Sequence, residues 1–253
     1  MILDEFKLDG RTAIVTGSSR GLGQGIAVGL AEAGADVALV DRSDSSETQE
    51  RIEALGRRCV TIRADLADRN CIPAIVDETV AKLGGIDILV NNAGIIRRAP
   101  LTEFTEKDWD DVMDVNVRTL FFLSQAVAKV MIEQGRGGKI INIASMLSFQ
   151  GGILVPSYTA SKSAVLGLTR LLANELASHG INVNAIAPGY MATENTKPLR
   201  EDPVRSKAIL ERIPAGRWGT PEDLQGAAVF LASTASQYLH GYTIAVDGGW
   251  LAR

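Results

Sequence analysis

Three polar residues in the second half of the chain have the types and spacing needed to move a proton beside a carbonyl group. Ser145 follows the apolar run GKIINIA, and Tyr158 and Lys162 lie on one face of an expected helix. A phenol with a pKa of about 10 is a poor base at neutral pH, but a nearby ammonium group stabilises its phenolate. The Ser145 hydroxyl could hold a carbonyl oxygen on which negative charge develops. This set indicates hydride transfer between a secondary alcohol and a ketone, with Tyr158 as the acid and base.

A glycine-rich segment near the N-terminus supplies a site for the cofactor of such a reaction. The first apolar run leads directly into TGSSRGLG at 16–23, and a segment of helical period follows. Gly17 permits a tight turn, Gly21 lets backbone amides approach a pyrophosphate, and Gly23 lets the helix pack closely, with its N-terminus facing the anion. The candidate cofactor residues of this segment are Gly17, Ser19, Arg20, Gly21, Leu22 and Gly23.

The residues after the next two apolar runs bear on which dinucleotide binds. Asp41 ends the second run, where a carboxylate can accept hydrogen bonds from the adenosine ribose hydroxyls and would repel a 2′-phosphate, so we expect NAD. Arg20 and Arg42 favour NADP instead, because a guanidinium can pair with the extra phosphate. Asp65 ends the third run and is either an adenine contact or a capping and turn residue.

The elements that must position these residues follow a regular alternation. Seven short runs rich in Val and Ile alternate with segments of helical period near 21–33, 46–56, 70–83, 106–134 and 157–178. Continuously apolar strands are typical of a parallel sheet that is covered on both faces. We therefore predict one domain spanning 1–253, an α/β doubly wound Rossmann fold with a seven-stranded parallel sheet and helices on both faces. Right-handed crossovers would place the carboxyl ends of the strands, and the ligand, along one edge.

One long irregular stretch interrupts this pattern. It runs from Pro188 to about Pro221 and contains a short polar helix candidate, PVRSKAILERI, at 203–213. Connections of this length in a compact domain usually have a function, often as a lid. We expect a lid over the active edge.

Composition excludes several other classes of function. Lys and Arg total 26 against 30 Asp and Glu, with no long run of like charge, so no nucleic-acid or anionic-membrane surface is expected. The N-terminus does not resemble a signal peptide, and no segment approaches the roughly 18 apolar residues of a membrane helix, which predicts a cytoplasmic protein. Cys59 and Cys71 are too few for a disulfide framework, and His179 and His240 lack metal-ligand spacing, so no metal is expected.

Taken together, these motifs resemble the short-chain dehydrogenase/reductase family over essentially the whole chain. The matching motifs, in order, are TGSSRGLG, Asn91-Asn92-Ala93-Gly94, Ser145, Tyr158-x-x-x-Lys162 and Pro188-Gly189. The resemblance implies that Tyr158 is the acid and base, that Ser145 orients the carbonyl and that Lys162 also binds the nicotinamide ribose. It implies that Asn116 completes a proton relay through water. It further implies cofactor contacts at Asp65, Leu66, Asn92, Ala93, Gly94, Tyr158, Lys162, Pro188, Gly189 and Thr193.

The resemblance also bears on assembly. Members of the family are commonly tetramers, joined through the helices that match 106–134 and 157–178. Both segments carry apolar residues beyond one stripe, as in VLGLTRLL, which suits a second buried face. We expect a homotetramer.

Several segments are similar to those of sugar-acid dehydrogenases within the family. They are IINIASMLSFQGG, VPSYTASKS, INVNAIAPGYMAT, RIPAGRWG and GYTIAVDGGWLAR. A sugar-acid carboxylate would favour a guanidinium, and Arg97 and Arg98 directly follow the NNAGII segment, although they could equally be solvated loop residues. Beyond Ser145, weaker candidates for substrate contacts are Gln150, Met191 and the lid around 195–213.

Two other functions remain open at this point. A 3-oxoacyl carrier-protein reductase shares the GRWGTPED-like segment, but it would need a basic docking surface and usually NADP, against which Asp41 argues. A non-catalytic dinucleotide sensor would be expected to lack Ser145, Tyr158 or Lys162. The sequence leaves undecided which hydroxyl reacts, the physiological direction and the strength of the preference for NAD.

Overall fold

The centre of the fold is a sheet of seven parallel strands in the order β3-β2-β1-β4-β5-β6-β7, in a computed structural model that describes residues 1–253. The strands are β1 (Thr12–Thr16), β2 (Asp36–Asp41), β3 (Cys59–Arg63), β4 (Ile88–Asn91), β5 (Gly138–Ile143), β6 (Ile181–Pro188) and β7 (Thr243–Val246). The strand order reverses between β1 and β4, and doubly wound sheets bind their ligands at the carboxyl ends of the strands at such a point. The predicted doubly wound Rossmann fold is confirmed.

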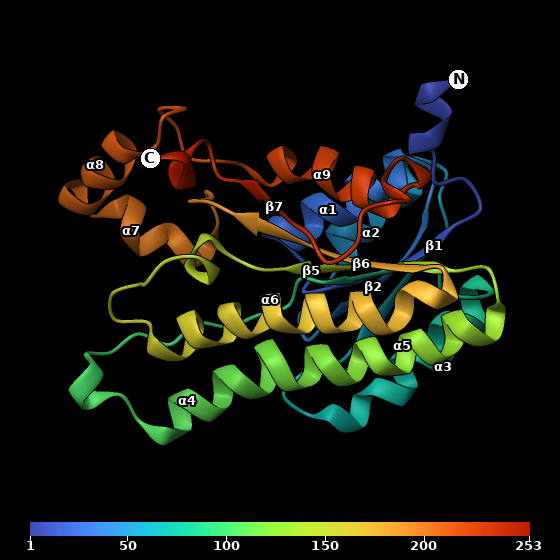
Figure 1. The fold of residues 1–253 in the computed structure, drawn as a ribbon, viewed down its shortest axis with the longest axis horizontal. Helices are drawn as coiled ribbons and strands as arrows, with labels where there is room; N and C mark the ends of the chain where they lie inside the picture. The colour runs from blue at the N-terminus through green and yellow to red at the C-terminus, as the bar shows by residue number, and fades with distance from the viewer.

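Helices cover both faces of the sheet (Figure 1). One face carries α1 (Gly21–Glu32), α2 (Ser46–Glu53) and α9 (Gln225–Ala232), and the other carries α3 (Ile72–Leu83), α4 (Glu106–Met113), α5 (Leu120–Gln134) and α6 (Pro156–Leu176). Successive residues of a strand point to opposite faces, so Ala13 and Val15 join the core on one side while Ile14 joins the core on the other. The strands are apolar along their length because both faces are buried.

Two helices were not predicted from the sequence pattern. One is α9, whose segment QGAAVFLA is apolar but has no stripe of helical period. The other is α7 (Lys197–Glu201), a short helix in the lid. Tertiary contact accounts for α9: it packs closely on α1, where a Cβ at Gly29 would lie 2.7 Å from the Gln225 side chain. Packing against α1, and not the periodicity of its own sequence, therefore accounts for the helical structure of α9.

The expected helix at 106–134 is continuous but irregular in its middle. A π-helical segment, Asp114–Thr119, joins α4 to α5, and such segments occur often at functional sites. By length and composition, Glu106–Gln134 is long and apolar enough to cross a membrane. This finding corrects the expectation that no segment approaches the length and apolar character of a membrane helix. In this fold Leu123, Val127 and Met131 of α5 are packed in the core on the sheet, so the helix is part of the domain interior.

The predicted lid lies beyond β6 at one end of the molecule (Figure 1). Its main helix, α8 (Pro203–Arg212), agrees with the short polar helix expected at 203–213. The Asp202 carboxylate accepts hydrogen bonds from the amides of Val204 and Arg205, and Pro203 occupies the first turn. This combination of cap and proline fixes where α8 begins.

Candidate active site

The three candidate catalytic side chains meet at the carboxyl edge of the sheet. Ser145 lies just beyond β5, and Tyr158 and Lys162 lie in the first turns of α6. The Lys162 ammonium nitrogen is 5.6 Å from the centre of the Tyr158 ring and donates a hydrogen bond of 2.6 Å to the carbonyl of Ile143. Lys162 is only 4% exposed and Ser145 only 8%. The fold therefore holds a phenol, an ammonium group and a hydroxyl together in a buried setting.

Burial sets the protonation states of this group. Desolvation raises the pKa of Tyr158, while a hydrogen bond with Ser145 and the charge of Arg98 lower it by less. Desolvation also lowers the pKa of Lys162 to about 8. Both shifts favour the neutral forms, so at neutral pH Tyr158 keeps its proton. A phenol in this state can give a proton to an alkoxide as it forms.

Asn116 links the segment after β4 to the catalytic helix. It is 1% exposed and lies in the π-helical segment. Its amide oxygen accepts from the Ile95 amide at 2.8 Å, and its amide nitrogen donates to the Ser161 hydroxyl at 3.1 Å. Ser161 in turn donates to the Tyr158 carbonyl at 2.8 Å. Asn116 is thus linked through the Ser161 hydroxyl to the backbone carbonyl of Tyr158.

Two hydroxyl residues that the sequence analysis did not single out help to hold this geometry. The Ser148 hydroxyl donates to the Lys162 carbonyl at 2.6 Å and accepts from the Ser145 amide at 3.3 Å, which ties the loop after β5 to α6. The Thr16 hydroxyl accepts from the Asn92 amide at 3.1 Å. The sequence offers only one indication of a role for Ser148 and Thr16, which is that each lies within or beside a motif described above.

The glycine-rich segment forms the tight turn that the sequence predicts. Gly17 has φ +65°, and a Cβ there would lie 3.0 Å from the Ala93 Cα atom. A Cβ at Gly23 would overlap the Gly17 carbonyl oxygen. The residue before α1, Arg20, provides no side-chain cap, so the first amides of the helix are left for a ligand, while Leu22 packs against the core. These features fit the pyrophosphate of a dinucleotide.

Asp41 lies beside this turn with both carboxylate oxygens engaged. One oxygen accepts from the Ser19 amide at 3.0 Å and the other from the Ser43 amide at 2.9 Å. Arg20 and Arg42 are exposed, and neither forms an ion pair. The geometry therefore keeps a carboxylate and two free guanidinium groups around the expected ribose position.

Asp65, the candidate contact for adenine, forms part of a turn in the structure. The Asp65 side chain accepts from the Ala67 amide at 3.0 Å, in the way expected of a turn residue. The Leu66 carbonyl accepts from the Thr119 hydroxyl at 2.7 Å, which anchors this turn to the π-helical segment. The other carboxylate oxygen of Asp65 forms no hydrogen bond with the protein and is free to accept one from a base.

The segment after β4 approaches the catalytic lysine closely. A Cβ at Gly94 would lie 3.2 Å from the Asn116 amide oxygen and 3.7 Å from the Lys162 ammonium nitrogen. Asn92 donates to the Gly17 carbonyl at 3.0 Å and so joins this segment to the glycine turn. The candidate cofactor residues and the candidate proton-transfer residues are therefore connected in one region of the structure.

The start of the lid also faces this site. Pro188 ends β6, and the Gly189 amide donates to the Val246 carbonyl at 3.0 Å, which keeps the strand pairing to its end. Beyond it, the Thr193 methyl group would lie 3.7 Å from a Cβ at Gly21, which has φ +60°. Thr193 thus lies next to the glycine turn.

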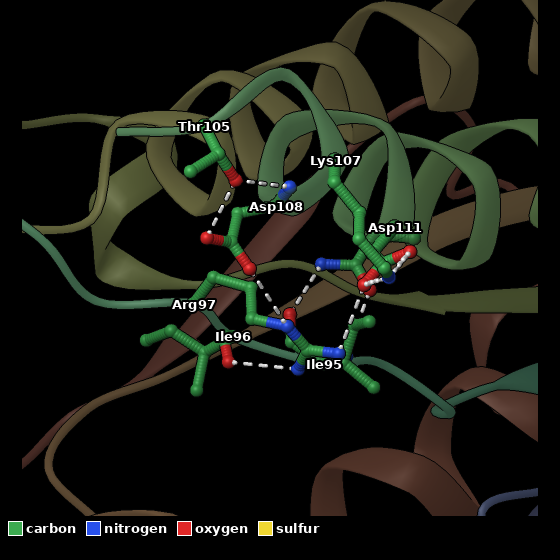
Figure 2. A network of polar contacts seen from close by, with 8 residues as sticks. Ile95, Ile96, Arg97, Thr105, Lys107, Asp108 and Asp111 are labelled. Carbon is green, nitrogen blue, oxygen red and sulfur yellow. Dashed lines mark hydrogen bonds and ion pairs between the residues drawn. The ribbon is translucent and has the colours of Figure 1, made fainter. Parts of the chain in front are cut away.

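The structure gives the two candidate arginines different partners, and Figure 2 shows those of Arg97. Arg97 pairs with Asp108 at 3.3 Å and with Asp111 at 3.2 Å, and Lys107 also binds Asp111, at 2.8 Å. Arg98 instead donates to the carbonyl of Asn195 in the lid at 3.1 Å. Arg97 is thus already neutralised by carboxylates of α4, whereas the charge of Arg98 is near enough to influence Tyr158.

The remaining substrate candidates differ in their surroundings. The Gln150 side chain accepts from Arg212 of α8 at 3.3 Å, so it joins the loop after Ser145 to the lid. Met191 is 4% exposed and belongs to the core, with Gly219 as a close neighbour. The Met191 side chain is therefore packed in the hydrophobic core.

The other residue types considered from the sequence take ordinary positions. Cys59 and Cys71 are free thiols, and burial raises the pKa of both, that of Cys59 to about 12. No three residues among His, Cys, Asp and Glu are grouped so that they could hold a metal ion.

Comparison with known proteins shows the family and the relatives that this chain resembles. The family model described as Enoyl-(Acyl carrier protein) reductase matches residues 17–251. The 2-dehydro-3-deoxy-D-gluconate 5-dehydrogenases of Dickeya dadantii and Escherichia coli are 66% and 65% identical to this chain, and in both cases 100% of each chain is covered. A solved structure of gluconate 5-dehydrogenase from Burkholderia cenocepacia, in complex with NADP and tartrate, has a TM-score of 0.94 and 44% identity, with 100% of each chain covered.

These findings also identify the cofactor class as a nicotinamide dinucleotide, for which the glycine turn has the required shape. With a family match over most of its length, full-length relatives and the assembled Ser145, Tyr158 and Lys162, the chain belongs to the short-chain dehydrogenase/reductase family of oxidoreductases.

Proposed function

We propose that this enzyme interconverts a secondary alcohol and a ketone on a deoxy sugar acid, as a 2-dehydro-3-deoxy-D-gluconate 5-dehydrogenase in sugar-acid catabolism. The observation that carries the chemistry is the half-buried Tyr158 beside the buried Lys162 and Ser145, with 5.6 Å between the ammonium nitrogen and the ring centre. The substrate class is supported by full-length relatives of that name at 66% and 65% identity.

In the direction of ketone reduction, the chain supplies everything except the hydride, which comes from the bound nicotinamide. The Ser145 hydroxyl holds the carbonyl oxygen, and Tyr158 gives its proton to that oxygen as negative charge develops there. Lys162 stabilises the phenolate that remains. Asn116 supports the backbone at Tyr158 through Ser161, and we assign it the first step of a proton relay to solvent.

Arg98 is the residue that we assign to the substrate carboxylate. Its one hydrogen-bond partner, the Asn195 carbonyl, is neutral, whereas Arg97 is already paired with two carboxylates. A carboxylate forms shorter and stronger charge-assisted hydrogen bonds with a guanidinium than a neutral carbonyl does. The acid group of the substrate would therefore compete well for Arg98.

NAD is the proposed cofactor, with NADP as the less favoured alternative. The Asp41 carboxylate lies against the glycine turn, where it would repel a 2′-phosphate. The free guanidinium groups of Arg20 and Arg42 are the reason to expect some activity with NADP.

The second candidate function is 2-deoxy-D-gluconate 3-dehydrogenase, which uses the same chemistry at another carbon. The same residues would serve it, and the two differ in how far the reacting carbon lies from the acid group. An acyl carrier-protein reductase is less favoured because Asp41 argues against the NADP that such enzymes usually need.

We also propose a homotetramer located in the cytoplasm. Large apolar side chains are exposed on the helices that would form the contacts: Trp109, Phe122, Ile132 and Leu171. Burying such a surface against a second copy is favourable. Light scattering of the purified protein should give the mass of a tetramer, and a monomer would contradict the proposal.

The test of function is oxidation of NADH by the purified protein with a panel of keto sugar acids, 3-deoxy-2,5-hexodiulosonate foremost. The Tyr158→Phe variant keeps the ring and removes the acid, so its turnover should fall about 100-fold or more. Turnover by the wild type that persists in the variant would contradict the assigned chemistry. No turnover across the panel would contradict the assigned substrate class.

A further inference from the structure

The lid carries a guanidinium beside the catalytic loop that the reaction chemistry leaves without a role. Arg212, the last residue of α8, stacks on Trp250, with 4.0 Å between its Cζ atom and the ring centroid. Its Nη2 atom donates to the Gln150 amide oxygen at 3.3 Å. Gln150 lies on the loop that begins at Ser145. One long hydrogen bond to a neutral acceptor thus joins the lid to the loop that holds the reacting carbonyl.

The C-terminal tail fixes the platform beneath this arginine. Gly248 and Gly249 have φ +65° and +88°, a conformation that glycine adopts without strain. The Asp247 carboxylate closes the turn by accepting from the amides of Gly249 and Leu251, each at 2.9 Å. Trp250 is 5% exposed, and its indole N–H has no hydrogen-bond partner. The ring is therefore rigid and retains a buried donor without an acceptor.

Arg212 lacks the carboxylate partner that seven other arginines of the chain have. Those that form ion pairs with carboxylates are Arg11, Arg57, Arg58, Arg97, Arg118, Arg136 and Arg217. Arg212 forms no such pair, and stacking uses the face of the guanidinium while leaving its N–H groups at the edge free. A planar group that is fixed on a ring and has free donors suits the bidentate binding of a carboxylate.

We propose that Arg212 is a second, lid-borne ligand of the substrate carboxylate, so that closure of the lid depends on the acid group. This inference rests on the proposed function. The acid displaces the neutral Gln150 oxygen from Arg212, and Arg98 binds it from the loop after β4. Because Arg98 also contacts the lid, at the Asn195 carbonyl, both guanidinium groups exchange a neutral acceptor for the substrate. Neutral sugars would lack this exchange and bind weakly.

The experiment compares Arg212→Gln, Arg212→Lys and the control Lys207→Gln. Lys207 is an exposed cation of α8 whose nearest carboxylate is Glu211 at 3.8 Å, so its loss changes the charge of the helix without touching the catalytic loop. Two readouts are taken. One is KM and kcat for the keto acid that the wild type reduces best. The other is calorimetric binding of tartrate, with threitol as its neutral counterpart, to the enzyme with NADH bound.

The expected result for Arg212→Gln is a rise of about 10- to 100-fold in KM, because a charge-assisted hydrogen bond is lost, with kcat changed by less than about threefold. Tartrate binding should weaken by a similar factor, Arg212→Lys should lie between, and Lys207→Gln should match the wild type. A fall in kcat at constant KM would show that Arg212 only holds the lid in place and would overturn the inference. Tartrate that binds the wild type no better than threitol would overturn it as well.

The two proposals can fail separately. Wild-type enzyme that reduces no keto acid would refute the proposed function, while the tartrate measurement would still report on Arg212. Melting temperatures of the variants, compared with the wild type, show whether a loss of binding reflects loss of folding, and the conservative Arg212→Lys variant keeps the comparison valid if Arg212→Gln unfolds.

Discussion

Replacing Lys162 by Met removes the charge that makes Tyr158 a usable base while filling similar space. The ammonium nitrogen lies 5.6 Å from the centre of the Tyr158 ring. At an effective dielectric constant of about 20, two unit charges at that separation interact by about 3 kcal/mol. Since about 1.4 kcal/mol corresponds to a factor of ten, we expect kcat/KM to fall about 100-fold and the apparent pKa of the phenol to rise by about two units.

The assay is a pH series of kcat/KM from about pH 6 to about pH 10, followed by NADH absorbance. Burial lowers the pKa of Lys162 to about 8, so its ammonium group is present below that pH and is lost above it. The wild-type profile should therefore decline as the pH rises through about 8, and Lys162→Met should lack this limb.

Lys139 offers a matched control for this experiment. It is also a buried lysine whose pKa burial lowers to about 8, but it lies near the start of β5, at the opposite edge of the sheet, and donates to Asn182. Lys139→Met should therefore keep the wild-type profile. Lys162→Met activity within about threefold of wild type at every pH would refute the reasoning, as would an equal change in Lys139→Met.

Three further outcomes follow from the site. Asp41→Ala should raise the ratio of kcat/KM for NADP over NAD by about tenfold or more, because the repulsive carboxylate is lost while Arg20 and Arg42 remain, and an unchanged ratio would count against this role. Arg98→Gln should raise KM for the keto acid about tenfold. Arg97→Gln should change that KM by less than about twofold, because Asp108 and Asp111 already neutralise the charge of Arg97. Equal effects of the two substitutions on KM would contradict the assignment of the substrate carboxylate to Arg98. Gly23→Ala should lower the free energy of unfolding by about 1–3 kcal/mol, because the added Cβ would overlap the Gly17 carbonyl oxygen. The substitution should also weaken NADH binding, measured by fluorescence. Unchanged NADH binding would contradict the assignment of the glycine turn as the pyrophosphate site.

The sequence determined the fold class and the chemistry because both depend on local patterns. Continuously apolar runs identify buried parallel strands, and the glycine spacing at 16–23 identifies a turn before a helix. The spacing of Tyr158 and Lys162 places both on one face of α6 wherever that helix packs. These inferences needed no knowledge of distant contacts.

The tertiary structure decided what depends on contacts between distant segments. Arg97 and Arg98 are equivalent in sequence, and only the position of α4 gives Arg97 two carboxylate partners and leaves Arg98 with a neutral carbonyl. The helix α9 forms because it packs on the glycines of α1, and its own sequence has no stripe that would reveal it. The pairing of Arg212 with Trp250 joins the lid to the C-terminal tail, and a contact of this kind leaves no periodic signal in either segment.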